Sequence, residues 1–152
     1  MVRHFSFEGH CYHVTSATQG RRPVFADTAA AQVLENAFHF IRQERAFILA
    51  YAIMPDHFHA LIVPRGDFSL SQLMQSVKGF VAREINAATD ERGPLWQRGF
   101  YDRGIRNDEQ LLATIEYIHE NPVKEGLANT AKEYRFSSAW PSAKTDLETF
   151  FA

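Results

Sequence analysis

The 152-residue sequence lacks several features that would assign it to whole classes of protein. It has one cysteine, Cys11, so no disulfide can form within the chain, and we expect a reducing, cytoplasmic setting. No apolar run approaches the ~18 residues that a membrane-spanning helix needs, so no membrane span is expected. Residues 1–10, "MVRHFSFEGH", lack the apolar core of a signal peptide.

The chain also lacks the basic excess that is typical of duplex-DNA binders. Its formal net charge is −2, so any surface that binds nucleic acid must be local. Apolar material is abundant, however, since 45% of the residues are hydrophobic and 13 are phenylalanine. This composition predicts one folded domain over residues 1–152, with residues 141–152 as a peripheral tail.

The hydrophobic pattern predicts strands that alternate with helices. Strands are expected at residues 9–18, 46–54 and 57–64, and residues 95–105 are expected to form a strand or an irregular ribbon. Helices are expected from the cap Asp27 to about residue 45, from Ser69 to about 87, and from Asn107 to Asn121, before Pro122. The order β-α-β-β-α-β-α predicts an α+β, ferredoxin-like sandwich, with helices on one face of an antiparallel sheet and a ligand site on the other.

The stretch "YAIMPDHFHALIVP", residues 51–64, places two histidines inside an apolar strand. Side chains two residues apart in a strand project from the same face, so His57 and His59 are neighbours, about 6–7 Å apart at Cα. Two imidazoles at this spacing can bind one cation. Backbone groups or water can equally satisfy such a pair, and the pair alone leaves both interpretations open.

The pair does not identify a metal either. Zinc prefers four close ligands, mostly nitrogen or sulfur, whereas magnesium and manganese accept oxygen ligands and retain water. His10, Cys11 and His13 are suitable zinc ligands, but nothing in their spacing places them near the pair.

The predicted third helix carries a second informative pair, in "NDEQLLATIEYIHENPVKEGL". Tyr117 and Asn121 are four residues apart, so they share a helix face, at the border of the apolar stripe. There they can face a metal site on the sheet. Alternatively, Tyr117 is a boundary residue with its hydroxyl in water, and Asn121 is a helix C-terminal residue ahead of Pro122. His119 falls on the far flank of the stripe and is not counted as a ligand.

A basic, aromatic stretch lies between these helices. Residues 92–106 contain four arginines and one aspartate, a local charge of +3, interleaved with Trp96, Phe100 and Tyr101. Single-stranded DNA is bound by aromatic platforms and local positive charge. The predicted DNA-binding residues are Lys78, Trp96, Arg98, Phe100, Arg103 and Arg106. A core strand with its arginines in water is the alternative.

Six segments follow the order and spacing of one family: "YHVT", "MPDHFHALIVP", "SVKGFVAREIN", "LWQRGFYDRGI", "YIHENPVKEGL" and "YRFSSA". The chain resembles the REP-associated tyrosine transposases, a branch of the single-tyrosine HUH transposases, over about residues 3 to 140. The combination of His-apolar-His with Tyr-x-x-x-Asn-Pro is more specific than either element alone.

The resemblance implies a role for each matching residue. His57, His59 and Asn121 would hold a divalent cation, Mg²⁺ or Mn²⁺, and Tyr117 would be the nucleophile. The implied activity is a metal-dependent single-stranded DNA endonuclease and strand transferase that cleaves at hairpin-associated sites through a 5′-phosphotyrosine. The implied partner is single-stranded DNA with REP-like hairpins, and the protein would be a monomer or a homodimer. Asp56 is a weak candidate for the general base.

Two other functions remain as alternatives. The first is a hairpin-DNA-binding module that retains the fold without catalysis. The second is a small metallohydrolase that uses His13, His57 and His59 around zinc. The acidic tail "SAKTDLETFFA" departs from the basic tail frequent in the family, which leaves open which segments hold the DNA.

Overall fold

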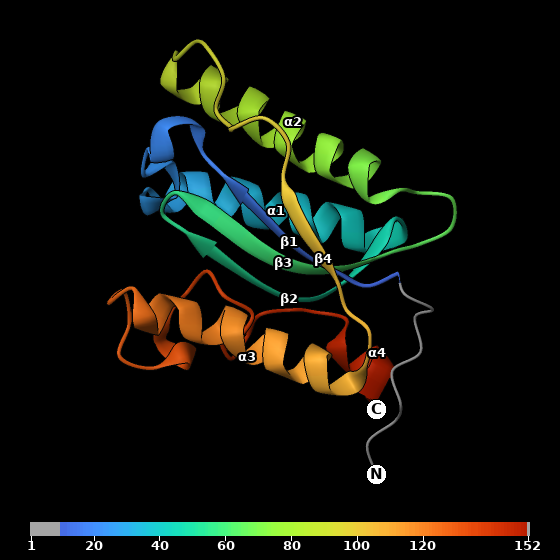
Figure 1. Cartoon of the computed structure of the whole chain (residues 1–152). Coiled ribbons are helices and arrows are strands. Elements are labelled where there is room, and N and C mark those ends of the chain that lie inside the picture. The colour runs from blue at the N-terminus through green and yellow to red at the C-terminus, as the bar shows by residue number, and fades with distance from the viewer. Residues whose placement is uncertain (1–9, 152) are drawn as a thin grey trace.

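A four-stranded antiparallel sheet forms the centre of the computed structural model, which describes residues 10–151 and, of these, the side chains of residues 10–149 (Figure 1). The strands are β1 (Tyr12–Ala17), β2 (Ala46–Met54), β3 (His57–Pro64) and β4 (Tyr101–Gly104). The helices are α1 (Thr28–Glu44), α2 (Leu70–Thr89), α3 (Asp108–Lys124) and the short α4 (Leu147–Phe151). No helix within residues 10–151 is both long and apolar enough to cross a membrane.

The strand order β2-β3-β1-β4 places the histidine-bearing strand β3 inside the sheet, between β2 and β1. With β-α-β-β-α-β as the order of the first six main elements, the predicted α+β, ferredoxin-like fold is confirmed. The three long helices also begin at the positions that their capping residues predict. Asp27 accepts a hydrogen bond from Ala29, Ser69 forms a capping box with Gln72, and Asn107 accepts one from Gln110.

The two faces of the sheet bury separate hydrophobic cores. Alternate residues of β3, Phe58, Ala60 and Ile62, point into the core that α1 and α2 cover. Leu61 and Val63 point to the other face, into a core shared with α3. The expectation that the helices lie on one face is therefore wrong for α3, whose apolar stripe packs over β2 on the face opposite α1 and α2 (Figure 1).

Helix α3 also continues past its predicted end, since Pro122 lies inside it and the last helical residue is Lys124. Proline removes one backbone donor without preventing the residues after it from bonding. The carbonyl of Asn121 accepts from Glu125, and that of Pro122 accepts from Leu127, at 3.1 and 2.9 Å. The chain then leaves the helix at Gly126, where φ is +75°, a value that glycine adopts at little cost.

The C-terminal segment covers the outer edge of β2. Backbone hydrogen bonds join Ile53 to Phe136, Ser138 to Tyr51, and Asp146 to Ile48. The Asp146 carboxylate also forms two hydrogen bonds of 2.9 Å with Arg42 of α1. Asp146, within the segment expected to be a peripheral tail, thus pairs backbone groups that β2 would otherwise leave unpaired at the sheet edge.

This anchor predicts a stability effect. Asp146→Ala removes the ion pair with Arg42 and a bond from the Ile48 N–H, so we expect the free energy of unfolding to fall by about 2 kcal/mol or more. Urea denaturation measures it. Glu148→Ala, at an exposed position two residues on, is the matched control and should change stability by less than about 0.5 kcal/mol. Equal effects of the two substitutions would contradict the anchoring role.

Candidate functional site

Strand pairing assembles polar side chains from three strands on the face that α3 covers. Thr15 of β1 pairs with His59 of β3 on one side and with Tyr101 of β4 on the other. His13 pairs with Arg103. Because directly paired residues of an antiparallel sheet project from the same face, these five side chains belong to one surface.

The two predicted metal-binding histidines lie side by side on β3. Their ring centroids are 5.0 Å apart, with the planes at 88°. His57 Nδ1 lies 2.7 Å from a carboxylate oxygen of Asp56, whose other oxygen accepts from Arg21 at 2.9 Å. These bonds leave the Nε2 of His57 as its remaining ring nitrogen.

Asp56 is consequently not free to act as the general base for which it was a candidate. Partial burial alone would raise its pKa, but the hydrogen bonds from His57 and Arg21 outweigh burial and hold the pKa below its ordinary value. An ionised carboxylate with both oxygens bonded orients the imidazole beside it.

His59 is 5% exposed, and its Nδ1 contacts two side chains of β1. His13 Nε2 lies 3.0 Å away and Thr15 Oγ1 lies 3.1 Å away. Burial, with the neighbouring His13 and His57, lowers the pKa of His59 to about 3. Burial and the charge of Arg103 lower the pKa of His13 to about 4. Both imidazoles are therefore neutral at pH 7, the form in which histidine binds metals.

Tyr117 of α3 lies over this cluster. Its ring centroid is 5.5 Å from that of His59 and 5.9 Å from that of His13, both in edge-on arrangements. The Lys124 ammonium lies 5.8 Å from the centroid of the phenol ring. Tyr117 is 46% exposed, so a large ligand can reach its hydroxyl.

Asn121, one helical turn beyond Tyr117, is 8% exposed, and its side-chain oxygen has no hydrogen-bond partner within the described chain. The next turn brings Glu125 to a cavity of about 320 Å³ that His57 and Asp56 also line. Tyr117 thus lies near His59 and Glu125 lies near His57. Residues four apart share a helix face, so Asn121 belongs to the same face of α3 as Tyr117 and Glu125. An unpaired buried acceptor is costly, and a cation would satisfy it.

The other side of the cluster opens into a cavity of about 500 Å³. His13, His59, Tyr117, Tyr101 and Arg103 line it, together with Thr114 of α3. It is therefore a hollow beside the phenol that β1, β3, β4 and α3 build jointly.

The predicted DNA-binding residues do not form one surface. Arg103 lies in this hollow, whereas Lys78, Trp96 and Phe100 line a separate groove between α2 and the segment before β4. Arg98 and Arg106 are exposed and line neither cavity.

One of these assignments conflicts with the structure, and a second residue also has a structural role. Trp96 is 7% exposed, packs against Phe25 and Phe58, and donates to the Lys78 carbonyl, so it is a core residue and not a stacking platform. The Lys78 ammonium donates to the carbonyl oxygens of Gln97 and Gly99, and burial lowers the pKa of Lys78. These bonds tie the segment before β4 to α2 and leave the ammonium one further donor, so its contact with DNA stays a prediction.

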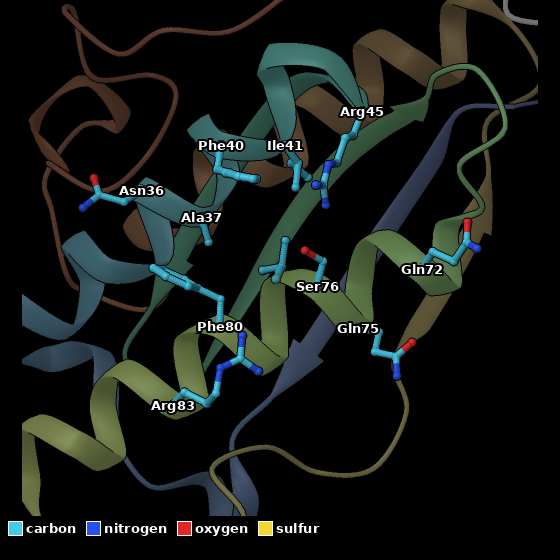
Figure 2. A pocket seen from close by; sticks show the side chains of 11 residues that line it. Asn36, Ala37, Phe40, Ile41, Arg45, Gln72, Gln75, Ser76, Phe80 and Arg83 are labelled. Atoms are coloured by element: carbon cyan, nitrogen blue, oxygen red, sulfur yellow. The ribbon is translucent and has the colours of Figure 1, made fainter.

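A further cavity, of about 440 Å³, lies between α1 and α2 (Figure 2). Phe40 of α1 and Arg45, the residue after this helix, approach it from one side, and Phe80 and Arg83 of α2 from the other (Figure 2). Both helices cover the sheet face opposite His59, so this cavity is separate from the histidine site.

The sequence-based interpretation named His13 only as a zinc ligand in the metallohydrolase alternative, and it missed Thr114. The pattern His-Val-Thr at residues 13–15 already indicates two polar side chains on one strand face, but only the pairing of β1 with β3 places them beside His59. Thr114 lies three residues before Tyr117, and its hydroxyl is buried without a partner within the described chain. No sequence signal marks that property.

The zinc alternative also finds no support in the geometry. Within residues 10–151, no three His, Cys, Asp or Glu side chains are arranged to hold a metal ion. His13 directs its Nε2 at the Nδ1 of His59, so it does not share a third position with His57 and His59.

The fold and the site together define a class: a ferredoxin-like domain with a histidine pair on the sheet and a tyrosine facing it from a helix. A family model described as "Transposase IS200 like" matches residues 6–121. The chain belongs to this family, which places it among the transposase-like, DNA-processing enzymes.

Similar proteins identify the branch. The REP-associated tyrosine transposase of Escherichia coli (strain K12) is 27% identical over 138 residues, 90% of this chain and 80% of that protein. The structure of a REP-associated tyrosine transposase bound to a REP hairpin matches with a TM-score of 0.71 and 26% identity, over 91% of this chain and 81% of that one. The predicted resemblance to REP-associated tyrosine transposases is confirmed.

The lowered histidine pKa values predict a pH effect in metal-free protein. The unfolded chain binds protons at His13 and His59 below pH ~6.5, whereas the folded chain does not until about pH 4 and 3. The free energy of unfolding should therefore fall as the pH drops from 6.5 to 5, by up to about 1.4 kcal/mol per pH unit for each proton.

Urea denaturation at several pH values measures this slope, and NMR should show neither ring taking up a proton above pH 5. His13→Gln removes one titrating group and should flatten the slope. A midpoint between pH 6 and 7 for either ring would contradict the burial argument.

Proposed function

We propose that this chain is a metal-dependent single-stranded DNA endonuclease and strand transferase, with Tyr117 as the nucleophile. One observation carries the proposal. Helix α3 places the Tyr117 ring 5.5 Å from His59 and, one turn on, carries Asn121, whose buried side-chain oxygen has no hydrogen-bond partner within the described chain.

The donor set fits a hard divalent cation such as Mg²⁺ or Mn²⁺. His57 and His59 each have one ring nitrogen engaged by neighbouring side chains, which leaves Nε2 of each for a metal. Asn121 would supply the third ligand, an amide oxygen. Two neutral nitrogens and one oxygen leave positions for water or phosphate oxygens, as these cations require. When bound, the cation supplies Lewis-acid stabilisation of the phosphate charge.

The side chains that hydrogen-bond the two histidines support the same assignment. Metal-binding histidines usually donate their other ring N–H to a carboxylate, hydroxyl or similar acceptor, which fixes the tautomer. Asp56 provides this for His57, and Thr15 with His13 provides it for His59. The neutral state of His13 suits an acceptor Nε2.

The reaction is transesterification at phosphorus. The Tyr117 oxygen forms a bond to phosphorus, and the bond from phosphorus to the 3′ oxygen of the preceding nucleotide breaks. The phenol proton passes to water at the exposed mouth of the cavity, and the leaving 3′ oxygen takes a proton from water. The products are a 5′-phosphotyrosine and a free 3′ hydroxyl. Since the phosphodiester is retained, a second strand can be joined by the reverse step.

Hairpin-bearing single-stranded DNA is the proposed substrate. The REP-associated tyrosine transposase with a TM-score of 0.71 was solved bound to a REP hairpin. Arg103 beside Tyr117, with the exposed Arg98 and Arg106, supplies local positive charge despite the chain's net charge of −2. Tyr117 and the histidines meet within one chain, which favours catalysis by each protomer alone.

Tyr117→Phe should abolish covalent protein–DNA adducts on hairpin-bearing single strands, because it removes only the attacking oxygen. Denaturing gels measure the adduct, and unchanged thermal unfolding should accompany its loss. Tyr134→Phe is the matched control: that hydroxyl donates to the Ile53 carbonyl, away from the cluster, and adduct formation should persist. Adducts that survive Tyr117→Phe would contradict the assignment.

Asp56→Ala should weaken Mn²⁺ binding about 10–100-fold, because it releases the ring of His57. Isothermal titration calorimetry without DNA measures the affinity directly. Asp67→Ala, an exposed carboxylate on the loop after β3, is the control and should leave the affinity as it is. If both variants bind Mn²⁺ like the parent chain, His57 is not a ligand.

A further inference from the structure

We propose that the cavity of about 500 Å³ beside Tyr117 is a binding subsite for one unpaired nucleotide next to the scissile phosphate. This inference rests on the proposed function and adds the group that fixes the substrate there. The residues that would hold the nucleotide are Tyr101, Arg103 and Thr114. None of them is a metal ligand or the nucleophile.

Tyr101 provides the stacking surface. It is 79% exposed on the edge strand β4, yet its side chain lines the cavity. Exposing a tyrosine ring to this extent buries little apolar area and does not help the fold. A ring at the rim of a cavity that also contains the nucleophile can stack on a base, which is worth roughly 1–3 kcal/mol and tolerates any base.

Arg103 provides the charge. It is two residues from Tyr101 on β4, so both side chains project from the same face. His13 is paired opposite Arg103, and none of the described residues that line this cavity is acidic. The guanidinium therefore faces a ligand without competition from a carboxylate, as binding a phosphate requires.

Thr114 provides an independent sign of a ligand. It is 3% exposed, and its hydroxyl has no hydrogen-bond partner in the described chain. A threonine within a helix ordinarily returns its hydroxyl to a carbonyl three or four residues earlier, which would satisfy it. Thr114 lines the cavity, three residues from Tyr117 and on the same helix face. Rotation about its χ1 would turn the buried hydroxyl toward the cavity, where a base edge or sugar oxygen would pair with it.

The charge and size of the second cavity, on the other side of the histidine pair, make it less suited to bind the nucleotide. The cavity beside His57 is smaller, about 320 Å³, and Asp56 and Glu125 line it. Its arginine, Arg21, is already paired with Asp56. Two carboxylates against one committed guanidinium disfavour a phosphate, and no aromatic ring lines that side except His57.

The test compares binding of an intact and an abasic substrate. Full-length chain carrying Tyr117→Phe, which cannot react, is titrated with a fluorescent hairpin oligonucleotide and with copies that lack the base on either side of the mapped cleavage site. Removing the base at one of these positions should weaken binding about tenfold. Tyr101→Ala should weaken binding of the intact oligonucleotide similarly and add no loss on that abasic copy. Tyr101→Phe, which keeps the ring, should restore the affinity.

Thr114→Val distinguishes an effect on DNA binding from an effect on stability. It removes the unpaired hydroxyl at equal volume, so thermal stability should rise or hold while binding of the intact oligonucleotide weakens about threefold or more. Leu112→Ala, at a position 53% exposed on the same helix and outside the cavity, is the control for surface effects.

Two outcomes would overturn the subsite. In the first, Tyr101→Ala binds the intact oligonucleotide as tightly as the Tyr117→Phe parent does. In the second, Tyr101→Ala lowers the affinity for the intact and the abasic oligonucleotide by the same factor. The chain with Tyr117 intact is assayed for cleavage in parallel. Cleavage without a Tyr101 effect refutes the subsite alone, whereas absence of cleavage and adducts refutes the proposed function.

Discussion

Packing of α3 against β2 is the constraint on which the site depends. The apolar stripe of α3, with Leu111, Ile115 and Ile118, is buried on the sheet face that carries His59. This fixes the rotation of the helix, so the adjacent stripe of Thr114, Tyr117 and Asn121 must face the strands. A rotation of α3 by one residue position, about 100°, would turn the phenol away from the imidazoles and bury a polar side chain in its place.

A second requirement is that the imidazoles stay neutral and oriented. His59 achieves both through burial, since water is excluded and Thr15 and His13 hold its Nδ1. His57 is held from the hairpin turn, by the ion-paired Asp56. The turn between β2 and β3 therefore also orients part of the site, because its residue Asp56 fixes the direction of the His57 imidazole. The buried unpaired oxygen of Asn121 and hydroxyl of Thr114 mark where the fold gives up hydrogen bonds that a ligand can supply.

Much of this could be predicted from the sequence because the signals are local. The alternation around His57 and His59 and the capping residues Asp27, Ser69 and Asn107 specify elements without reference to the rest of the chain. Family resemblance added the pairing of Tyr117 with the histidines, which spacing alone left open. Contacts between distant segments could not be predicted from spacing. These include the burial of Trp96, the hydrogen-bond distance between His13 and His59, and the contacts of Asp146 with β2, all of which depend on tertiary packing.

We infer that one chain gathers His57, His59 and Asn121 around a single cation beside Tyr117. Anomalous diffraction from crystals grown with Mn²⁺ would locate this cation. We expect one strong peak within bonding distance of both imidazole Nε2 atoms and of the Asn121 side-chain oxygen. A peak elsewhere, or one bonded to the histidines with the Asn121 oxygen turned away, would contradict it.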